Sequence, residues 1–110
     1  MKFEEYQTLA RRTQNKDLDN TQREYHAMHG MASEVGEIHG LYQKVFQGHV
    51  ATKEAAVKEL GDLLWFMAEY TDALGVDLEA VARMNIDKLR KRYPDGFDVD
   101  HSVHREEYGG

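Results

Sequence analysis

Apolar and polar residues alternate along most of the chain with a helical period. Apolar positions recur at spacings of three and four residues in four segments, at residues 2–13, 21–46, 52–74 and 77–93. Runs of β-branched residues with period-two alternation, which would indicate strands, do not occur. The pattern therefore predicts an all-α protein, a bundle of four to five helices.

Local signals define the ends of the predicted helices. Thr52 and Asp77 belong to the residue types that cap a helix N-terminus, and Gly75 is a typical C-terminal stop. Pro94, the only proline of the chain, ends the last predicted helix. Residues 95–110 are polar, and we expect them to form a tail that is disordered or ordered only against a partner.

The composition limits the possible classes of function. A chain of 110 residues suits one domain, over residues 1–110. Its net charge of −6 disfavours nucleic acid and membrane surfaces as partners, because both are polyanionic. It has no cysteine, and therefore no disulfide or thiolate chemistry. The N-terminus lacks a signal-like apolar segment, and no run of about 18 apolar residues occurs. We expect a soluble, cytoplasmic protein.

The second predicted helix carries two carboxylates three residues apart, Glu34 and Glu37. On a helical wheel Glu34 lies inside an apolar stripe that includes Met31, Ile38 and Leu41, whereas Glu37 lies at its border. A bare carboxylate inside such a stripe costs several kcal/mol. Glu34 must therefore be protonated, paired with a lysine or arginine, or bound to a metal ion.

The third predicted helix carries Glu59 and Asp62 at the same spacing. The wheel places this pair on a polar side with Glu69, opposite an apolar side that we expect to form the core: Val57, Leu60, Leu63, Leu64, Met67 and Leu74. Taken alone, the pair also fits a solvated helix face. If the two helices pack antiparallel, however, four carboxylates meet at one point, and like charges so close require cations.

The ligand chemistry of these carboxylates favours Mg²⁺ or Mn²⁺ over zinc, because all the donors are oxygen atoms. Mg²⁺ commonly shares its coordination with substrate phosphates, so the cluster indicates phosphate chemistry. A di-iron site is disfavoured, because none of the acids is followed by a histidine three residues later. Two histidine pairs, His26 with His29 and His101 with His104, lack a third ligand in the sequence and also fit ordinary surface positions.

The fourth predicted helix carries candidate phosphate ligands. Asn85 shares a stripe with apolar residues and is expected to face inward. Lys88 and Arg92 follow it by one and two helical turns. Lysine and arginine suit phosphate oxygens, and Asn85 could contact metal, sugar or base. Cations near a helix C-terminus also complement the helix dipole, so both interpretations stay open.

Two further residues are candidates for substrate contact. Lys44 lies on the Glu37 side of its helix and could assist phosphate binding. Phe66 could stack on a nucleobase. Its neighbour Trp65 is expected in the core, where aromatic residues at helical spacing are common.

The set of motifs resembles the MazG-like all-α nucleoside triphosphate pyrophosphohydrolases, in particular short members of phage type. The matching segments are Glu34-Val35-Gly36-Glu37, Glu59-Leu60-Gly61-Asp62, Asn85-Ile86-Asp87-Lys88-Leu89 and Arg92-Tyr93-Pro94-Asp95-Gly96-Phe97. The resemblance covers nearly the whole chain. The family pattern is Glu-Glu-x-x-Glu followed by Glu-x-x-Asp, and Ser33 stands where its first glutamate would be.

The resemblance implies Mg²⁺-dependent cleavage of a nucleoside triphosphate between the α and β phosphates, which yields a monophosphate and pyrophosphate. It implies Glu34, Glu37, Glu59 and Asp62 as metal ligands, with Glu34 and Glu37 in the catalytic centre. Glu37, at the border of its stripe, is our candidate base. The resemblance also implies a homodimer or homotetramer with sites near subunit interfaces. A non-catalytic nucleotide-binding or metal-binding regulator and a structural bundle with paired carboxylates remain alternatives.

Overall fold

The computed structural model describes residues 1–109 and confirms the predicted all-α class. Its helices are α1 (Phe3–Arg11), α2 (Asn20–Gln43), the 3₁₀ helix η1 (Lys44–Gln47), α3 (Lys53–Leu74), α4 (Leu78–Arg92) and α5 (Val99–Val103). Among these described helices, none is both long and apolar enough to cross a bilayer. The chain divides into two compact units, Met1–Leu78 and Glu79–Gly110.

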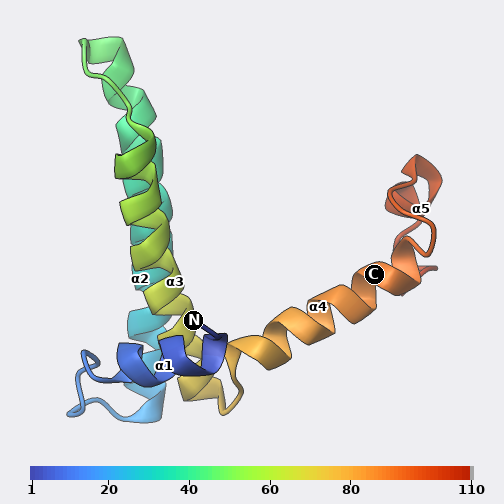
Figure 1. The fold of residues 1–110 in the computed structure, drawn as a ribbon, viewed down its shortest axis with the longest axis horizontal. Coiled ribbons are helices and arrows are strands. Elements are labelled where there is room, and N and C mark those ends of the chain that lie inside the picture. Colours follow the sequence, from blue (N-terminus) through green and yellow to red (C-terminus); the bar gives the residue numbers. More distant parts are fainter. Residues whose placement is uncertain (110) are drawn as a thin grey trace. The chain divides into compact units, whose positions relative to one another are not determined.

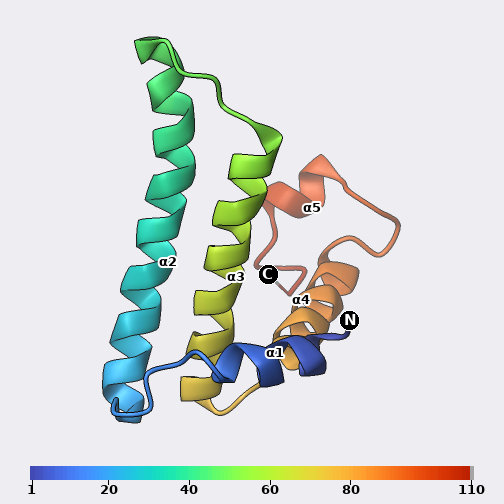
Figure 2. The ribbon, with the colours of Figure 1, turned by 60° about the vertical axis from the view of Figure 1, so that its left-hand side comes forward.

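The first unit is built on a long hairpin of α2 and α3. The two helices run antiparallel and side by side over most of their length (Figures 1 and 2). Helix α1 crosses the hairpin near the end of α3, against which it packs. The hairpin therefore brings the second and third predicted helices together, as the carboxylate pattern requires.

Side chains cap both helices of the hairpin. Asp19 accepts a hydrogen bond from the backbone N–H of Gln22 at 2.8 Å, and the Gln22 side chain accepts one from the Asp19 N–H at 3.0 Å. Thr52 accepts from the Ala55 N–H at 3.1 Å and starts α3, as predicted. Gly75 ends α3, as predicted, and adopts the left-handed conformation with φ 76°.

Polar contacts attach α1 to the end of α3. Asp72 accepts hydrogen bonds from Nε and Nη2 of Arg11 at 2.8–3.1 Å and from the Gln14 amide at 2.9 Å. Gln7 is fully buried, and its side-chain oxygen accepts from the Leu78 N–H at 2.8 Å. These contacts satisfy polar groups that would otherwise be costly to bury.

The packing side of α3 differs from the prediction. Glu69, assigned to the polar side, has no exposed surface. Several residues assigned to the core are exposed in the single chain: Val57, Leu60, Met67 and Leu74. The assignment was wrong because both sides of α3 are partly apolar. Phe66 adds a large ring to the acidic side, and that side is the one that packs on α2.

The second unit contains α4 and the short helix α5, which the apolar pattern did not predict. The Asp98 side chain caps α5 by accepting from the His101 N–H at 3.0 Å. Asp100 pairs with His104 at 3.1 Å. The expectation that the whole tail lacks structure of its own is therefore wrong for Val99–Val103, because polar side-chain contacts stabilise this turn without apolar periodicity.

Candidate metal centre

Three carboxylates converge between α2 and α3. One oxygen atom from each of Glu34, Glu59 and Asp62 lies within 4.8 Å of the other two. Glu59 and Asp62 are neighbours on one face of α3, because residues three apart in a helix lie side by side. Glu34 reaches them from α2 across the antiparallel pair. The hairpin thus assembles an all-oxygen cluster from distant parts of the sequence.

The environment of Glu34 is unfavourable for a negative charge. The pKa of Glu34 is raised to about 7, chiefly by a hydrogen bond with Glu59 in which the protonated carboxyl of Glu34 takes part, and then by burial. The charges of Asp62, Glu59 and Glu37 add to the effect. When Glu34 is ionised, its Oε2 atom is buried and has no hydrogen-bond donor.

These observations fit a divalent cation. A buried carboxylate oxygen without a donor needs a positive partner, and three clustered carboxylates repel one another unless a cation neutralises them. Oxygen donors of this kind suit Mg²⁺ and Mn²⁺. The alternative for Glu34 was a buried ion pair. Among the described residues, none of the salt bridges made by lysine or arginine involves Glu34.

Glu37 is exposed and does not belong to the group of three within 4.8 Å. It lies one turn after Glu34 on α2, close enough for its charge to raise the pKa of Glu34. The structure therefore brings three of the four predicted ligands together. The fourth faces solvent, in agreement with the expected difference between the two acids of α2. Ser33, at the position where the family pattern has another glutamate, is also exposed.

Phe66 lies next to the cluster, one turn after Asp62. Its ring packs directly on the backbone of α2, because a Cβ atom placed on Gly30 would lie 2.2–2.6 Å from three ring atoms. The ring also makes edge contacts with His26, at a centroid distance of 5.5 Å, and with Trp65, at 5.1 Å. Trp65 packs against the small core, as predicted. The position of Phe66 is thus tightly determined.

The candidate ligands for phosphate and base belong to other helices than the cluster. Asn85, Lys88 and Arg92 belong to α4 in the second unit, and Lys44 is exposed in η1. Asn85 was expected to face inward but is exposed, because neighbouring apolar positions of α4, such as Val81, are themselves exposed in the single chain. A role of these four residues in phosphate or base binding stays a prediction.

A buried acid–histidine pair was missed by the sequence analysis. Oε1 of Glu69 lies 2.5 Å from Nδ1 of His26, and Oε2 of Glu69 is buried without a hydrogen-bond donor. The sequence analysis considered His26 only together with His29. The spacing offered a usable signal. Glu69 follows Asp62 by seven residues, and His26 precedes Glu34 by eight, which is about two helical turns in each case. Both residues therefore lie on the helix faces that carry the cluster.

A second group with suitable distances lies in the tail. Single ligand atoms of Asp98, Asp100 and His101 come within 4.8 Å of one another. These side chains cap α5 and pair with histidines of the same segment, at 3.0 Å for Asp98 and His101. Their contacts are accounted for by local structure, so the hairpin holds the better candidate.

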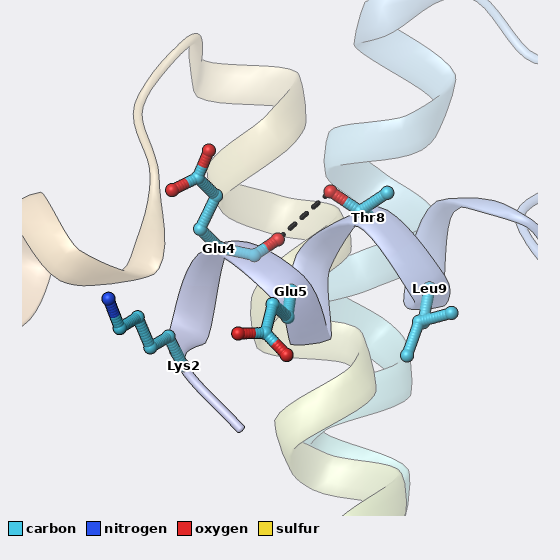
Figure 3. Close-up of a pocket in the computed structure, with 5 residues that line it drawn as sticks. All are labelled: Lys2, Glu4, Glu5, Thr8 and Leu9. Carbon is cyan, nitrogen blue, oxygen red and sulfur yellow. Dashed lines mark hydrogen bonds between the residues drawn. The ribbon is translucent and has the colours of Figure 1, made fainter.

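A shallow hollow beside α1 does not coincide with the cluster. Its lining residues come from the N-terminus and α1 (Figure 3): Lys2, Glu4, Glu5, Thr8 and Leu9. None of them is a predicted site residue. Another residue of α1, Tyr6, lies nearer the chemistry, since burial and the negative charge of Asp62 raise the pKa of its hydroxyl.

The fold and the cluster define a class of all-α proteins with a candidate divalent-metal site made of carboxylates from two antiparallel helices. The model of the MazG nucleotide pyrophosphohydrolase domain matches residues 22–97, more than half of the chain. The chain therefore belongs to the MazG nucleotide pyrophosphohydrolase family, which confirms the resemblance. It is also similar to the Gene 37 protein of Mycobacterium phage L5, with 31% identity over 81 residues, or 69% of this chain and 71% of the phage protein. No solved structure matches the chain.

Proposed function

We propose that the chain is a Mg²⁺-dependent nucleoside triphosphate pyrophosphohydrolase that cleaves ribo- or deoxyribonucleotides between the α and β phosphates. The observation that carries this proposal is the convergence of Glu34, Glu59 and Asp62, with one oxygen of Glu34 buried and lacking a donor. Membership of the MazG family supports it.

In this proposal each carboxylate has a defined role. Glu34, Glu59 and Asp62 would hold Mg²⁺, and Mn²⁺ could replace it. Bound Mg²⁺ would act as a Lewis acid that offsets charge developing on the phosphate oxygens. Glu37, exposed beside the cluster, would accept a proton from the attacking water. The water oxygen bonds to one of the two phosphorus atoms of the α–β bridge. The bond between that phosphorus and the bridging oxygen breaks, which leaves a nucleoside monophosphate and pyrophosphate.

The remaining candidates would bind the substrate. Lys88 and Arg92 would donate hydrogen bonds to phosphate oxygens, with Lys44 assisting. Asn85 would contact sugar or base. Phe66, beside Asp62, would contact the base.

We also expect a homodimer or homotetramer. Exposed apolar residues recur on α2 at a spacing of seven, at Met28, Val35 and Tyr42, and Val45 follows in η1. The corresponding stripe of α3 contains Val57, Leu60, Met67 and Leu74. Two such exposed apolar stripes on one hairpin are typical of a helix–helix interface, which a second copy of the chain would cover.

Pyrophosphate release from a panel of nucleotides with Mg²⁺ tests the proposed reaction. Wild-type protein should release pyrophosphate, and Glu34→Gln and Asp62→Asn should each lower turnover by at least about 100-fold, because loss of even an outer partner of a metal site costs up to that factor. Glu54→Gln, an exposed acid in the first turn of α3, is the matched control and should keep full activity.

The alternatives give different results in the same experiment. Unchanged turnover in both ligand variants would refute the assignment of the metal site. If the wild type binds nucleotide in the presence of Mg²⁺ but releases no product, the chain is a regulator and not an enzyme. If Mg²⁺ leaves thermal stability unchanged, the carboxylates belong to a structural bundle, because a metal that binds the native state must stabilise it.

A further inference from the structure

The buried pair of Glu69 and His26 has one end in the protein interior and one end in solvent. Glu69 is 0% exposed, whereas the His26 side chain is 48% exposed. The carboxylate accepts from Nδ1 of the imidazole at 2.5 Å. Nε2 is then the ring nitrogen that can pair with a group outside the hairpin.

Stability alone does not explain a charge at this position. Burying a carboxylate costs several kcal/mol before any pairing, and replacing a buried ion pair by well-packed apolar residues is often neutral or stabilising. The neighbours in sequence, Ala27 and Ala68, are completely buried and apolar. An apolar pair would therefore suit the same layer of the hairpin, unless the imidazole serves a ligand.

The pair lies at a distance from the carboxylate cluster that suits a nucleotide. With a rise of 1.5 Å per residue, His26 is about 12 Å from Glu34 along α2, and Glu69 is about 10 Å from Asp62 along α3. An extended nucleoside triphosphate spans such a distance from its phosphates to its base. Phe66 occupies the interval, and its ring meets the His26 ring at an interplanar angle of 61°.

We infer that His26, together with the adjoining edge of Phe66, contacts the nucleobase of the substrate, and that Glu69 is a positioning residue that fixes the imidazole. The inference rests on the proposed function for the identity of the ligand. An imidazole offers a stacking surface for a base, and its Nε2 atom can hydrogen-bond to the base edge. His26 would thus influence which base is preferred, whereas the carboxylate cluster acts on the triphosphate that all nucleotides share.

The test compares ligands with and without a base. His26→Gln keeps a donor for Glu69 but removes the ring, and His29→Gln, an exposed histidine one turn further along α2, is the matched control. kcat and KM are measured over a nucleotide panel, and equilibrium binding of nucleotides and of inorganic tripolyphosphate is measured by calorimetry with Mg²⁺. Tripolyphosphate carries the phosphate chain alone.

His26→Gln should raise KM and the nucleotide dissociation constant roughly tenfold, which corresponds to one lost base contact, and unequally among bases. kcat and tripolyphosphate binding should change less than twofold. Glu69→Gln should shift the same nucleotide constants in the same direction, because the imidazole loses its charged partner. A purely structural pair would not separate nucleotide from tripolyphosphate. If His26→Gln does not fold, the double variant H26L/E69L removes both groups and allows the same comparison.

The outcomes separate the two proposals. If the wild type releases no pyrophosphate but His26→Gln weakens binding of nucleotides and not of tripolyphosphate, the proposed reaction fails and the base contact is retained. If the wild type is active and His26→Gln affects both ligands equally, or neither, the base contact is overturned and the reaction stands.

Discussion

Substituting Gly30 by alanine tests the contact on which the hairpin geometry depends. Alanine normally stabilises a helix interior by about 0.8–1.0 kcal/mol relative to glycine. At Gly30, however, the new Cβ would lie 2.2 Å, 2.3 Å and 2.6 Å from Cε1, Cδ1 and Cγ of Phe66. Cγ is close to the backbone of α3, so the ring cannot avoid the methyl group by a small rotation.

The expected cost follows from these distances. Forcing an extra methyl into a packed contact typically costs 1–3 kcal/mol. After the helix-propensity gain is subtracted, Gly30→Ala should range from neutral to about 2 kcal/mol destabilising. Gly36→Ala, in the same helix with nothing within 4 Å of its Cβ position, should instead be stabilising by about 1 kcal/mol. The two variants should therefore differ by about 1–3 kcal/mol.

Urea unfolding at one fixed protein concentration measures this difference, since assembly would make stability concentration-dependent. In a thermal scan each kcal/mol corresponds to about 4–8 °C for a domain of this size. A second substitution, Phe66→Leu, should recover part of the loss in Gly30→Ala because the smaller side chain frees space. Equal stabilisation by alanine at Gly30 and Gly36 would refute the contact and the helix register derived from it.

Four further outcomes are expected. Without metal, in urea with EDTA, the free energy of unfolding should fall as pH rises from about 4.5 to about 7. The pKa of Glu34 is raised from 4.5 to about 7 in the folded state, which therefore binds the proton more tightly than the unfolded state. Glu34→Gln should flatten this pH profile, and a free energy of unfolding that rises over the same range would contradict the raised pKa. Mg²⁺ at a hundred times its dissociation constant should stabilise the wild type by about 2.7 kcal/mol in the same assay at pH 8, and Asp62→Asn should show little of this gain. Asp72→Ala should lower the free energy of unfolding in urea by about 1–3 kcal/mol, because Arg11 at the end of α1 and Gln14 just after it lose their acceptor; a loss below about 0.5 kcal/mol would show that other contacts hold α1. Leu60→Glu should shift sedimentation velocity towards a single chain, whereas Lys58→Glu beside it should not, and monomeric wild type would end the expectation of an oligomer.

Much of the local structure could be predicted from single residues. Thr52 and Gly75 mark the ends of α3 through contacts that involve only the adjacent backbone, so no knowledge of packing was needed. The spacing of Glu59 and Asp62 likewise determines that they share a face. Convergence with Glu34 followed from adding one assumption, that the two helices pair antiparallel.

The predictions for α3 were wrong where they depended on contacts between helices. The wheel for α3 could not distinguish two partly apolar sides, because the deciding contact, Phe66 on Gly30, joins residues 36 positions apart. The burial of Glu69 follows from the same contact. Helix α5 escaped detection for a different reason: Asp98 and other polar side chains form it through local hydrogen bonds, which leave no hydrophobic period.

The contact of the Phe66 ring with Gly30 also has a consequence for the connection between the two helices. If α3 slid along α2 by one turn, about 5.4 Å, Glu34 would leave Glu59, and His26 would leave Glu69, in the same movement. The ring and the absence of a side chain on Gly30 prevent this, so the pairing of these residues is determined by α2 and α3 themselves. The connection over residues 48–52 does not contribute to this pairing. A change in the length of this connection should therefore leave the spacing of the acids in this chain unchanged, provided that glycine remains at position 30.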